Sequence, residues 1–443
     1  MNKPIPESRW VNLRVEFLAG FSTYLTLSYI FIVNPVLLVG AGIDISRAFF
    51  ATVLSATLAT LAMGIWAKVP FAVAPAPSIT TFFVSYVVVK LQLPWPAAMA
   101  AVILSGVLSI VMTWLAVRQN LIAAIPTALR VGLVFAVGGF LIATGLTQAK
   151  LITYSAGLID LSTFDFSLLA SRNAMVLYTG LLVTVLFRIR WFNFTGAPLL
   201  GILAATLVAG LFGIKSTTKA HLSWDMVSGI GTVDFGPLLD PRFIFAMLVF
   251  FIIDFFGGVG KYVGLFTAMG NRSGELNKKG IERSLYIDGG GNIIGGILGA
   301  SSLAVFISSA VGITLGGRTG FTAIVIACFM FASIFTIPLV GAIPVEAISG
   351  ILVFVAFLLI PWGLIIKKEA ENNEETPLTG LDILFCFSAA LISFLTYGID
   401  KAILFVFLIY TAKIIWHGPT RKDIILIVTT TLLLLAVMAQ LFL

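Results

Sequence analysis

The sequence predicts an all-α membrane protein that crosses the lipid bilayer many times. Hydrophobic residues make up 59% of its 443 residues and charged residues only 11%, whereas a soluble domain carries roughly 25% charged residues. The mean hydropathy is +1.08, and apolar runs long enough to cross a bilayer recur along the whole chain. This composition excludes a nucleic-acid-binding protein, a disordered chain and a soluble enzyme. We therefore expect the lipid bilayer, and not nucleic acid, as a partner.

The apolar runs form two groups of seven, which predicts fourteen membrane-spanning segments. The spans of the first group are expected at residues 17–38, 48–66, 71–90, 96–116, 126–147, 174–187 and 197–213. Those of the second group are expected at residues 241–266, 284–298, 303–315, 319–338, 344–366, 380–396 and 399–416. A last apolar stretch, 423–443, fits a further span, a helix flat on the membrane or a helix packed along the protein.

The basic residues between the spans indicate the orientation of the chain. They precede the first predicted span and follow the sixth, eighth, twelfth and fourteenth: Lys3, Arg9, Arg14, Arg188, Arg190, Arg272, Lys278, Lys279, Arg283, Lys367, Lys368, Arg421 and Lys422. Cytoplasmic loops are enriched in Lys and Arg. All these loops share one side if the N-terminus is cytoplasmic, so we expect a multi-pass protein of the cell (inner or plasma) membrane, with segments 148–173 and 214–240 outside.

A pattern in the first group recurs in the second. An Ile-Pro pair followed by a glycine-containing apolar run occurs at residues 125–135 and again at residues 343–354. Upstream of each copy lies a short interrupted segment, at residues 69–78 and 299–309. Because seven is odd, the second group must enter the membrane upside down relative to the first. Inverted repeats with a broken helix at the same place in each half indicate a secondary transporter and locate its binding site.

The first interrupted segment is predicted to be extended. Pro70, Pro75 and Pro77 cannot lie in a continuous helix interior, because each removes an amide donor and clashes with the preceding turn. We expect a half-helix to begin between Ser78 and Thr80, with the Ser78 side chain as its N-cap.

The second interrupted segment is predicted to be a short strand, Val305-Phe306-Ile307, followed by a half-helix capped by Ser308 or Ser309. Extended backbone at membrane depth occurs only inside protein or beside a cavity. Two such segments pairing near the midplane would direct two helix N-termini to one point, which favours an anion or a polarised carbonyl. Two ordinary kinked helices are the alternative.

The eighth predicted span carries two ionisable residues, Asp254 and Lys261. Ionisable groups inside a span are costly and usually functional. The two are seven residues apart and therefore share one face of the helix; a structural ion pair is the alternative. Asp288 is expected near a helix entrance and not in the site.

These segments resemble the nucleobase–cation symporter-2 superfamily, and within it the adenine/guanine/hypoxanthine permease branch. The similarity lies in four stretches: residues 17–35, Pro70-Phe71-Ala72-Val73-Ala74-Pro75, Ile252-Ile253-Asp254-Phe255-Phe256, and residues 312–323 followed by Ile343-Pro344. The resemblance covers essentially the whole chain.

The resemblance implies a core domain that carries the substrate (residues 1–120 and 241–340) and a gate domain (residues 121–240 and 341–443). It implies transport by an elevator-like movement of the core against the gate, coupled to H⁺ or Na⁺, with Asp254 as the candidate ion site and no other cofactor or metal. A homodimer through the gate is also implied, and spans 5 and 12 carry small residues suited to it: Gly132, Gly138, Gly139 and Gly350.

The chain departs from this branch at residues implied to hold the base. Gly257 and Ser308 stand where the relatives carry acidic residues, and Lys261 stands where they carry a neutral or His side chain. Ala76-Pro77-Ser78-Ile79-Thr80 replaces their Gly-Met-Gly-Leu-Asn. The substrate-binding residues expected from the three segments are Ala76, Ser78, Ile79, Thr80, Asp254, Gly257, Gly258, Lys261, Phe306, Ser308 and Ser309.

The expected function is secondary-active transport of a small polar solute, by default a nucleobase such as a purine. The alternative is transport of a small organic or inorganic anion, with Lys261 as its charge partner. An enzyme is not expected, because Asp254 alone forms no catalytic cluster. A channel is not favoured either, since no segment resembles a selectivity filter.

Overall fold

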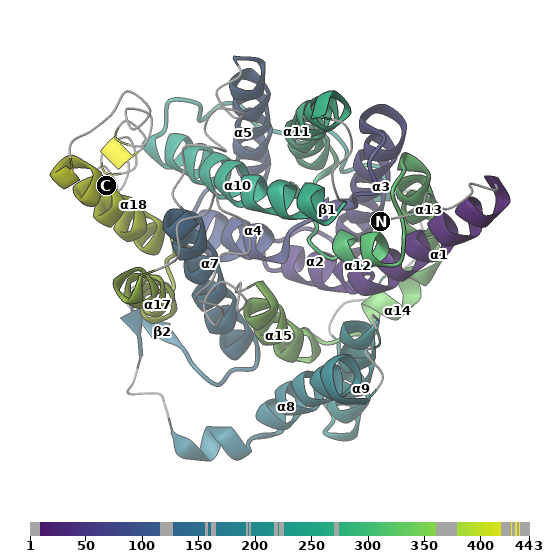
Figure 1. Cartoon of the computed structure of the whole chain (residues 1–443). Coiled ribbons are helices and arrows are strands. Elements are labelled where there is room, and N and C mark those ends of the chain that lie inside the picture. The colour runs from purple at the N-terminus through teal and green to yellow at the C-terminus, as the bar shows by residue number, and fades with distance from the viewer. Residues whose placement is uncertain are drawn as a thin grey trace.

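The computed structural model describes residues 9–115, 127–155, 158–160, 165–191, 194, 196–216, 220, 226–269, 274–359 and 379–417, and single residues 427, 430, 431 and 434. Within these ranges the protein is mostly helical, with two pairs of very short strands (Figure 1). Nearly all of the stretch 423–443 lies outside the described residues.

The first part of the chain contains two continuous helical segments and two broken ones. Its elements are α1 (Arg9–Leu27), α2 (Ile30–Val39), α3 (Ile45–Ala62) with the π-helical turn η1 (Met63–Ala67), β1 (Val73–Pro75), α4 (Pro77–Thr81), the π-helix η2 (Phe82–Lys90) and α5 (Trp95–Trp114). The predicted first span is thus two helices, separated by a break at Ser28 and Tyr29. Asp44 begins α3 by accepting hydrogen bonds from the backbone N–H groups of Ser46 and Arg47.

The second part holds three longer helices and a small hairpin. Its elements are α7 (Thr127–Gln148), β2 (Tyr154–Ser155), β3 (Leu158–Ile159), η4 (Phe166–Ala170), α8 (Arg172–Val185) with η5 (Leu186–Trp191), and α9 (Ala197–Leu211).

The third and fourth parts of the chain repeat the order of the first and second: a part with a short strand and half-helix, then a part with longer helices. The third contains α10 (Pro241–Ala268), α11 (Gly274–Leu298), β4 (Leu303–Val305), α12 (Ser309–Thr314), α13 (Gly320–Ala332), η7 (Ser333–Thr336) and α14 (Ile337–Gly341). The fourth contains η8 (Val345–Ile348), α15 (Ser349–Leu359), α17 (Gly380–Thr396) and α18 (Ile399–His417). The helix α11 begins ten residues before the predicted span at 284.

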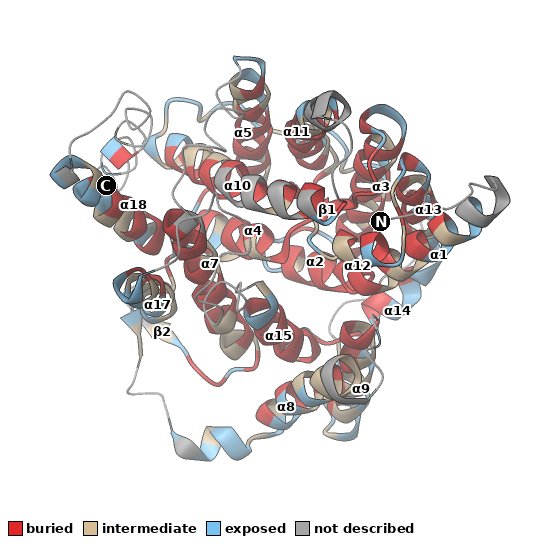
Figure 2. Cartoon of the chain, viewed as in Figure 1, coloured by how far each residue is buried: buried red, intermediate tan, exposed pale blue. Residues whose placement is uncertain are grey.

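The helices pack in two groups that touch along one side (Figure 1). In one group α5 packs on α10 and α11, α13 packs on α1 and α3, and α12 packs on α1. In the other, α7 packs on α15, α17 and α18, and α8 packs on α9 and α15. Buried residues gather where the helices face one another, and exposed residues lie on the outward turns of α8, α17 and α18 (Figure 2).

The outward surface is itself apolar, as expected where a protein meets lipid. Leu207 and Leu211 of α9, Phe335 and Leu384 are all exposed. Among the described residues, five helical segments are long and apolar enough to cross a membrane on their own: Leu13–Val39, Ile45–Ala67, Trp95–Trp114, Val131–Gln148 and Gly320–Gly341. The described part of the chain therefore has the surface and the helices of a membrane protein.

Glycines allow the helices of the second group to approach closely. A Cβ atom at Gly139 would lie 2.1 Å from the Ala390 carbonyl oxygen of α17, and one at Gly350 would lie 2.5 Å from the Leu177 carbonyl oxygen of α8. Gly132 faces Val406 of α18 in the same way. These three glycines were expected, together with Gly138, at a dimer contact, but Gly132, Gly139 and Gly350 serve packing inside the chain. The homodimer itself stays a prediction.

A buried glutamate joins the start of α13 to α1. The Glu16 carboxylate accepts hydrogen bonds from the backbone N–H of Arg318 (3.0 Å), the backbone N–H of Thr319 (3.1 Å) and the Thr322 hydroxyl. An acid at a helix N-terminus stabilises unpaired amides and the helix dipole. The Arg318 guanidinium donates to the Ala268 carbonyl (3.1 Å) at the end of α10. Arg318 thus bonds to α1 through its backbone N–H and to α10 through its side chain.

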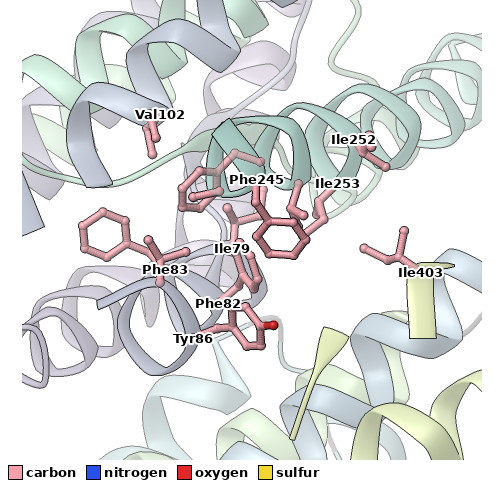
Figure 3. Packing of buried hydrophobic residues seen from close by; sticks show 14 of the residues in the cluster. Ile79, Phe82, Phe83, Tyr86, Val102, Phe245, Ile252, Ile253 and Ile403 are labelled. Atoms are coloured by element: carbon pink, nitrogen blue, oxygen red, sulfur yellow. The ribbon is translucent and has the colours of Figure 1, made fainter. Parts of the chain in front are cut away.

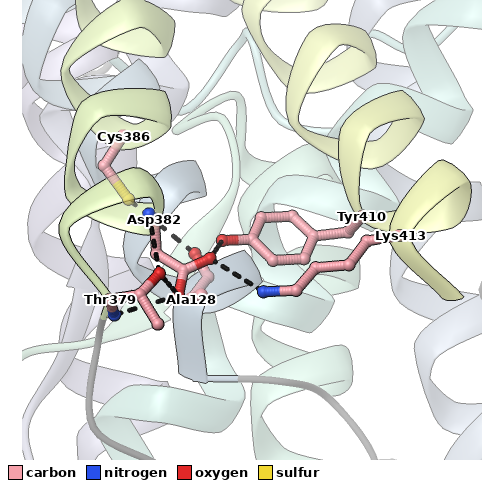
Figure 4. Close-up of polar contacts among 6 residues, drawn as sticks. All are labelled: Ala128, Thr379, Asp382, Cys386, Tyr410 and Lys413. Carbon is pink, nitrogen blue, oxygen red and sulfur yellow. Dashed lines mark hydrogen bonds and ion pairs between the residues drawn. The ribbon is translucent and has the colours of Figure 1, made fainter. Parts of the chain in front are cut away.

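A second buried acid joins α17 to α18. Asp382 and Thr379 form a reciprocal capping box at the start of α17. The same carboxylate accepts hydrogen bonds from the Tyr410 hydroxyl (3.1 Å) and from Lys413 Nζ (3.2 Å) of α18 (Figure 4). The Asp382 carboxylate thus accepts a hydrogen bond from a free backbone N–H at the start of α17 and also holds the neighbouring helix α18 in place.

Replacing Asp382 is expected to destabilise the fold. Asp382→Ala removes the cap and leaves Tyr410 and Lys413 without their acceptor, at a cost of about 2–4 kcal/mol. The thermal unfolding midpoint of the detergent-solubilised protein should fall clearly. The matched control is Lys150→Gln, which removes the charge of a side chain that is 69% exposed and pairs with the 12% exposed Glu346; a pair with one partner in solvent is expected to contribute roughly 1 kcal/mol or less. Equal midpoints for the two variants would contradict the role of Asp382.

Candidate functional site

The two broken segments pair with each other. Strand β1 runs antiparallel to β4, with Val73 opposite Val305, Ala74 opposite Ala304 and Pro75 opposite Leu303. All six residues are buried. Pairing of the two interrupted segments was predicted from the proline spacing and the β-branched run, and it joins opposite halves of the sequence. The second strand was expected at Val305-Phe306-Ile307 but lies two residues earlier, because Phe306 and Ile307 already turn into α12.

Further bonds extend the ladder on both sides. The Phe306 N–H donates to the Ala72 carbonyl (2.9 Å), and the Ala76 N–H donates to the Ser302 carbonyl (3.4 Å). The Ala72 N–H donates to the Ser309 hydroxyl oxygen (3.0 Å). Inside a bilayer no water is present to hydrogen-bond these backbone N–H and C=O groups. Each of these bonds therefore avoids the cost of an unpaired buried polar group.

Each strand is also held by a polar side chain of the preceding long helix. Thr60 of α3 donates its hydroxyl to the Val73 carbonyl (2.9 Å) and accepts from the Val73 N–H (3.0 Å). Asn292 of α11 accepts from the Leu303 N–H (2.9 Å) and from the Ser302 hydroxyl (2.9 Å). The two strands are thus anchored at corresponding places by corresponding helices.

The half-helix after β1 begins earlier than the sequence suggested. Ala76 occupies the N-cap position and Pro77 the first turn of α4. The expectation that Ser78 caps this helix is wrong, because proline fixes the backbone at this first position and has no N–H that needs a cap. Ser78 is half-buried and Ala76 is buried.

The other two predicted residues of α4 face inward. Ile79 lies in a large apolar cluster with Phe82, Phe83 and Tyr86 of η2 and with Phe245 of α10 (Figure 3). Thr80 is fully buried, and its hydroxyl donates to Asn34 Oδ1 (2.6 Å). In this structure Ile79 and Thr80 hold α4 in place.

The half-helix after β4 begins at the predicted residues. Ser308 occupies the N-cap position of α12, but its hydroxyl makes no capping bond. The Ser308 Oγ atom is buried and has no hydrogen-bond partner among the described residues. Ser309 is fully buried and bonded to Ala72, while Phe306 is half-buried beside the second apolar cluster.

A cluster of charges, Asp254 and Lys261 of α10 and Asp288 of α11, lies between these two helices. Asp254 is 2% exposed, and its Oδ2 accepts a hydrogen bond from Asn292 Nδ2 (2.8 Å). Lys261 interacts electrostatically with both Asp254 and Asp288. Two carboxylates therefore lie within electrostatic reach of one amine; taken as ionised, the three groups carry one excess formal negative charge. Asn292 bonds to both Asp254 and β4, so it connects this cluster to the strand pair.

Asp288 lies in the charge cluster, and its expected place at a helix entrance is wrong. It belongs to the middle of α11, is fully buried, and accepts a hydrogen bond from the Tyr262 hydroxyl (3.2 Å). Gly258 of α10 is buried. Gly257 lies in the same helix, but its surroundings are outside the described side chains.

Several residues that build the site were missed at the level of sequence. Asn34, Thr60 and Asn292 are fully buried and bond to the broken segments. A signal existed for two of them, because an Asn inside an apolar span is costly unless it is bonded. Asp288 and Asn292 are also four residues apart on one helix face.

Residues 14–392 match the model of the permease family of xanthine and uracil transporters. The chain belongs to this family. The protein MJ0326 of Methanocaldococcus jannaschii is 33% identical over 89% of this chain and 91% of its own. The adenine permease AdeP of Escherichia coli K12 is 29% identical over 88% of this chain and 87% of its own.

Membership of the xanthine/uracil permease family makes this protein a multi-pass membrane transporter and not an enzyme. Its fold is similar to that of the transmembrane domain of the cyanobacterial bicarbonate transporter BicA. The TM-score is 0.67 at 14% identity, covering 89% of this chain and 97% of that one. This likeness confirms the helical transporter fold.

Removing the Asn292 amide is expected to loosen the strand pair. Asn292→Leu keeps the approximate volume but leaves Asp254, Ser302 and the Leu303 N–H without this partner. A buried polar group without a partner costs about 1–3 kcal/mol, so the thermal midpoint should fall by several degrees. The control is Thr113→Val, which removes a buried hydroxyl bonded only to the Ser109 carbonyl of its own helix. An unchanged midpoint in Asn292→Leu would show that the bond contributes little.

Proposed function

We propose that this permease is a secondary-active transporter that moves a nucleobase across the cell membrane. The observation that carries the proposal is the pairing of β1 with β4, from which the half-helices α4 and α12 both begin. Broken helices at corresponding places are typical of substrate sites in secondary transporters. Family membership and the adenine permease AdeP support a nucleobase as the substrate.

The proposed architecture is fourteen membrane-spanning segments in two inverted repeats, with the N-terminus in the cytoplasm. Its support is the parallel order of α3, β1 and α4 in one half and α11, β4 and α12 in the other. Antiparallel pairing of β1 and β4 is what a two-fold axis in the membrane plane would produce. The same two-fold relation places Thr60 of α3 on β1 and Asn292 of α11 on β4.

A nucleobase is a planar ring with N–H and C=O groups on its edges, and the proposed site offers groups for both features. Phe306 is half-buried and its backbone N–H is bonded to the Ala72 carbonyl (2.9 Å), so an aromatic ring is placed close to the start of α12, where it could stack on a base. Ser308 Oγ is buried without a partner among the described residues, and Ser78 is half-buried. These hydroxyls would bond the polar edge of the base, and Ser308 would do so at a position where the relatives carry an acid.

The charge cluster between α10 and α11 is proposed to bind the coupling cation. Asp254 and Asp288 both interact with Lys261, so one added H⁺ or Na⁺ would neutralise the excess formal charge. Asp254 is the proposed ion site, because Asn292 connects it directly to β4. The alternative of an anionic substrate has less support, because Lys261 already faces two carboxylates.

The proposed transport step is movement of the core (residues 1–120 and 241–340) against the gate (residues 121–240 and 341–443). A contact between the two is the hydrogen bond from the Tyr397 hydroxyl to Ser85 Oγ (3.0 Å). Tyr397 belongs to the turn between α17 and α18, and Ser85 to η2, which continues α4. Such movement would break this bond. A homodimer through the gate is proposed on the resemblance to nucleobase symporters.

The function is tested by uptake into proteoliposomes that contain the purified protein. Adenine, guanine, hypoxanthine, xanthine and uracil are compared with bicarbonate and small organic acids, under a pH gradient and under a sodium gradient. We expect saturable, counterflow-competent uptake of at least one nucleobase, driven by one of the gradients. Uptake of an acid without uptake of any nucleobase would contradict the proposal.

Two substitutions separate the roles of the charged residues. Lys261→Gln should keep nucleobase counterflow within a few-fold of wild type, since the base is not expected to pair with a cation. Asp254→Asn should keep counterflow but lose uptake driven by the gradient. Lys90→Gln, at the exposed end of η2, is the matched lysine control. Loss of all counterflow in Lys261→Gln with a normal Lys90→Gln would favour the anion alternative.

A further inference from the structure

The side chain of Asn34 is bonded to both broken segments. It lies in α2 and is fully buried. Its Nδ2 donates to the Ala300 carbonyl (3.2 Å) and to Thr52 Oγ1 (2.8 Å), and its Oδ1 accepts from Thr80 Oγ1 (2.6 Å). Thr80 belongs to α4, while Ala300 lies just ahead of β4. The Asn34 amide therefore connects three places: α4 in the first half of the chain, the entry into β4 in the second half, and α3.

The neighbours of Asn34 allow only one orientation of its amide. The Thr52 hydroxyl already donates to the Ala48 carbonyl (2.6 Å), so towards Asn34 it offers only lone pairs. The Ala300 carbonyl also only accepts. Asn34 must therefore turn its NH₂ group to both, and its Oδ1 to Thr80, which must donate. A flipped amide would place an oxygen against two acceptors.

The turn that Asn34 holds has an unusual backbone. Gly299 has φ +88° and Ser301 has φ +72°, on either side of Ala300. Residues other than glycine rarely adopt positive φ, and such turns persist only where their surroundings hold them. The bond from Asn34 to the Ala300 carbonyl fixes this turn in space, and with it the entry into β4 and α12.

We infer that Asn34 is a positioning residue of the substrate site, which sets the place of α4 relative to β4 without touching the solute. The inference rests on the proposed function. A base held between residues of both segments needs them at a fixed separation, and small misplacements weaken such sites strongly. Because Asn34 acts through Thr80 and Ala300, its loss should raise KM and leave the maximal rate of uptake much less changed.

The test measures nucleobase affinity and uptake for folded, monodisperse variants. Asn34→Leu should weaken binding at least ten-fold and raise KM in parallel, with less than a three-fold change in maximal rate. Thr80→Val should weaken binding, whereas Thr80→Ser, which keeps the hydroxyl, should restore it. The double variant Asn34→Leu/Thr80→Val should bind no more weakly than Asn34→Leu, because the two residues share one bond. Thr113→Val is the control. Binding within two-fold of wild type in folded Asn34→Leu would overturn the inference, as would additive effects in the double variant.

A second measurement needs no substrate, so it separates this inference from the proposed function. Amide hydrogen exchange is compared between wild type and Asn34→Leu over residues 72–81 and 300–309. Exchange there should be at least ten-fold faster in Asn34→Leu and unchanged in Thr113→Val. If no nucleobase binds to wild type, the proposed function fails, and exchange alone decides the role of Asn34. Unchanged exchange in Asn34→Leu would then overturn the inference.

Discussion

Two strands of three residues each, buried among apolar helices, set the position of everything else in the site. The pairing of β1 with β4 satisfies backbone groups that lipid and apolar side chains cannot satisfy. A chain interrupted by Pro70, Pro75 and Pro77 cannot close its own hydrogen bonds as a helix, so it takes them from a partner strand. The partner comes from the other half of the sequence, and the two half-helices therefore start side by side.

The strand pair is held by polar residues of long helices, and the same residues connect it to the charges. Thr60 bonds to β1 and Asn292 bonds to β4, while Asn292 also bonds to Asp254. A change in the charge of Asp254 therefore alters the hydrogen bond to Asn292, which is itself bonded to β4. This short connection between an ionisable group and the start of α12 is a physical route by which an ion and a solute can influence each other. At their outer ends the helices are fixed in a similar way, with Glu16 and Asp382 each accepting from several donors.

The sequence predicted the apolar helices and the pairing of the two extended segments, because each leaves a local trace. Apolar runs indicate the spans, prolines exclude helix before Pro77, and the β-branched run predicted a strand at Val305-Phe306-Ile307, two residues after the observed strand Leu303–Val305. The break at Ser28 and Tyr29 left no such trace, since the run from 17 to 38 contains no helix breaker before Pro35. The side-chain contacts were less accessible still. Nothing local to Asp288 reveals that Lys261 faces it, and nothing local to Asn34 reveals that Thr80 and Ala300 meet there, because these pairs depend on how distant helices pack.

The central claim is that the substrate lies between the starts of α4 and α12, at the end of the β1–β4 pair. It is tested most directly by a cryo-electron microscopy structure of the protein in lipid nanodiscs with a transported nucleobase bound. We expect planar density within hydrogen-bonding distance of Ser308 and in stacking contact with Phe306, with β1 and β4 still paired. Density for the base elsewhere in the protein, or a bound state in which the two strands have separated, would contradict it.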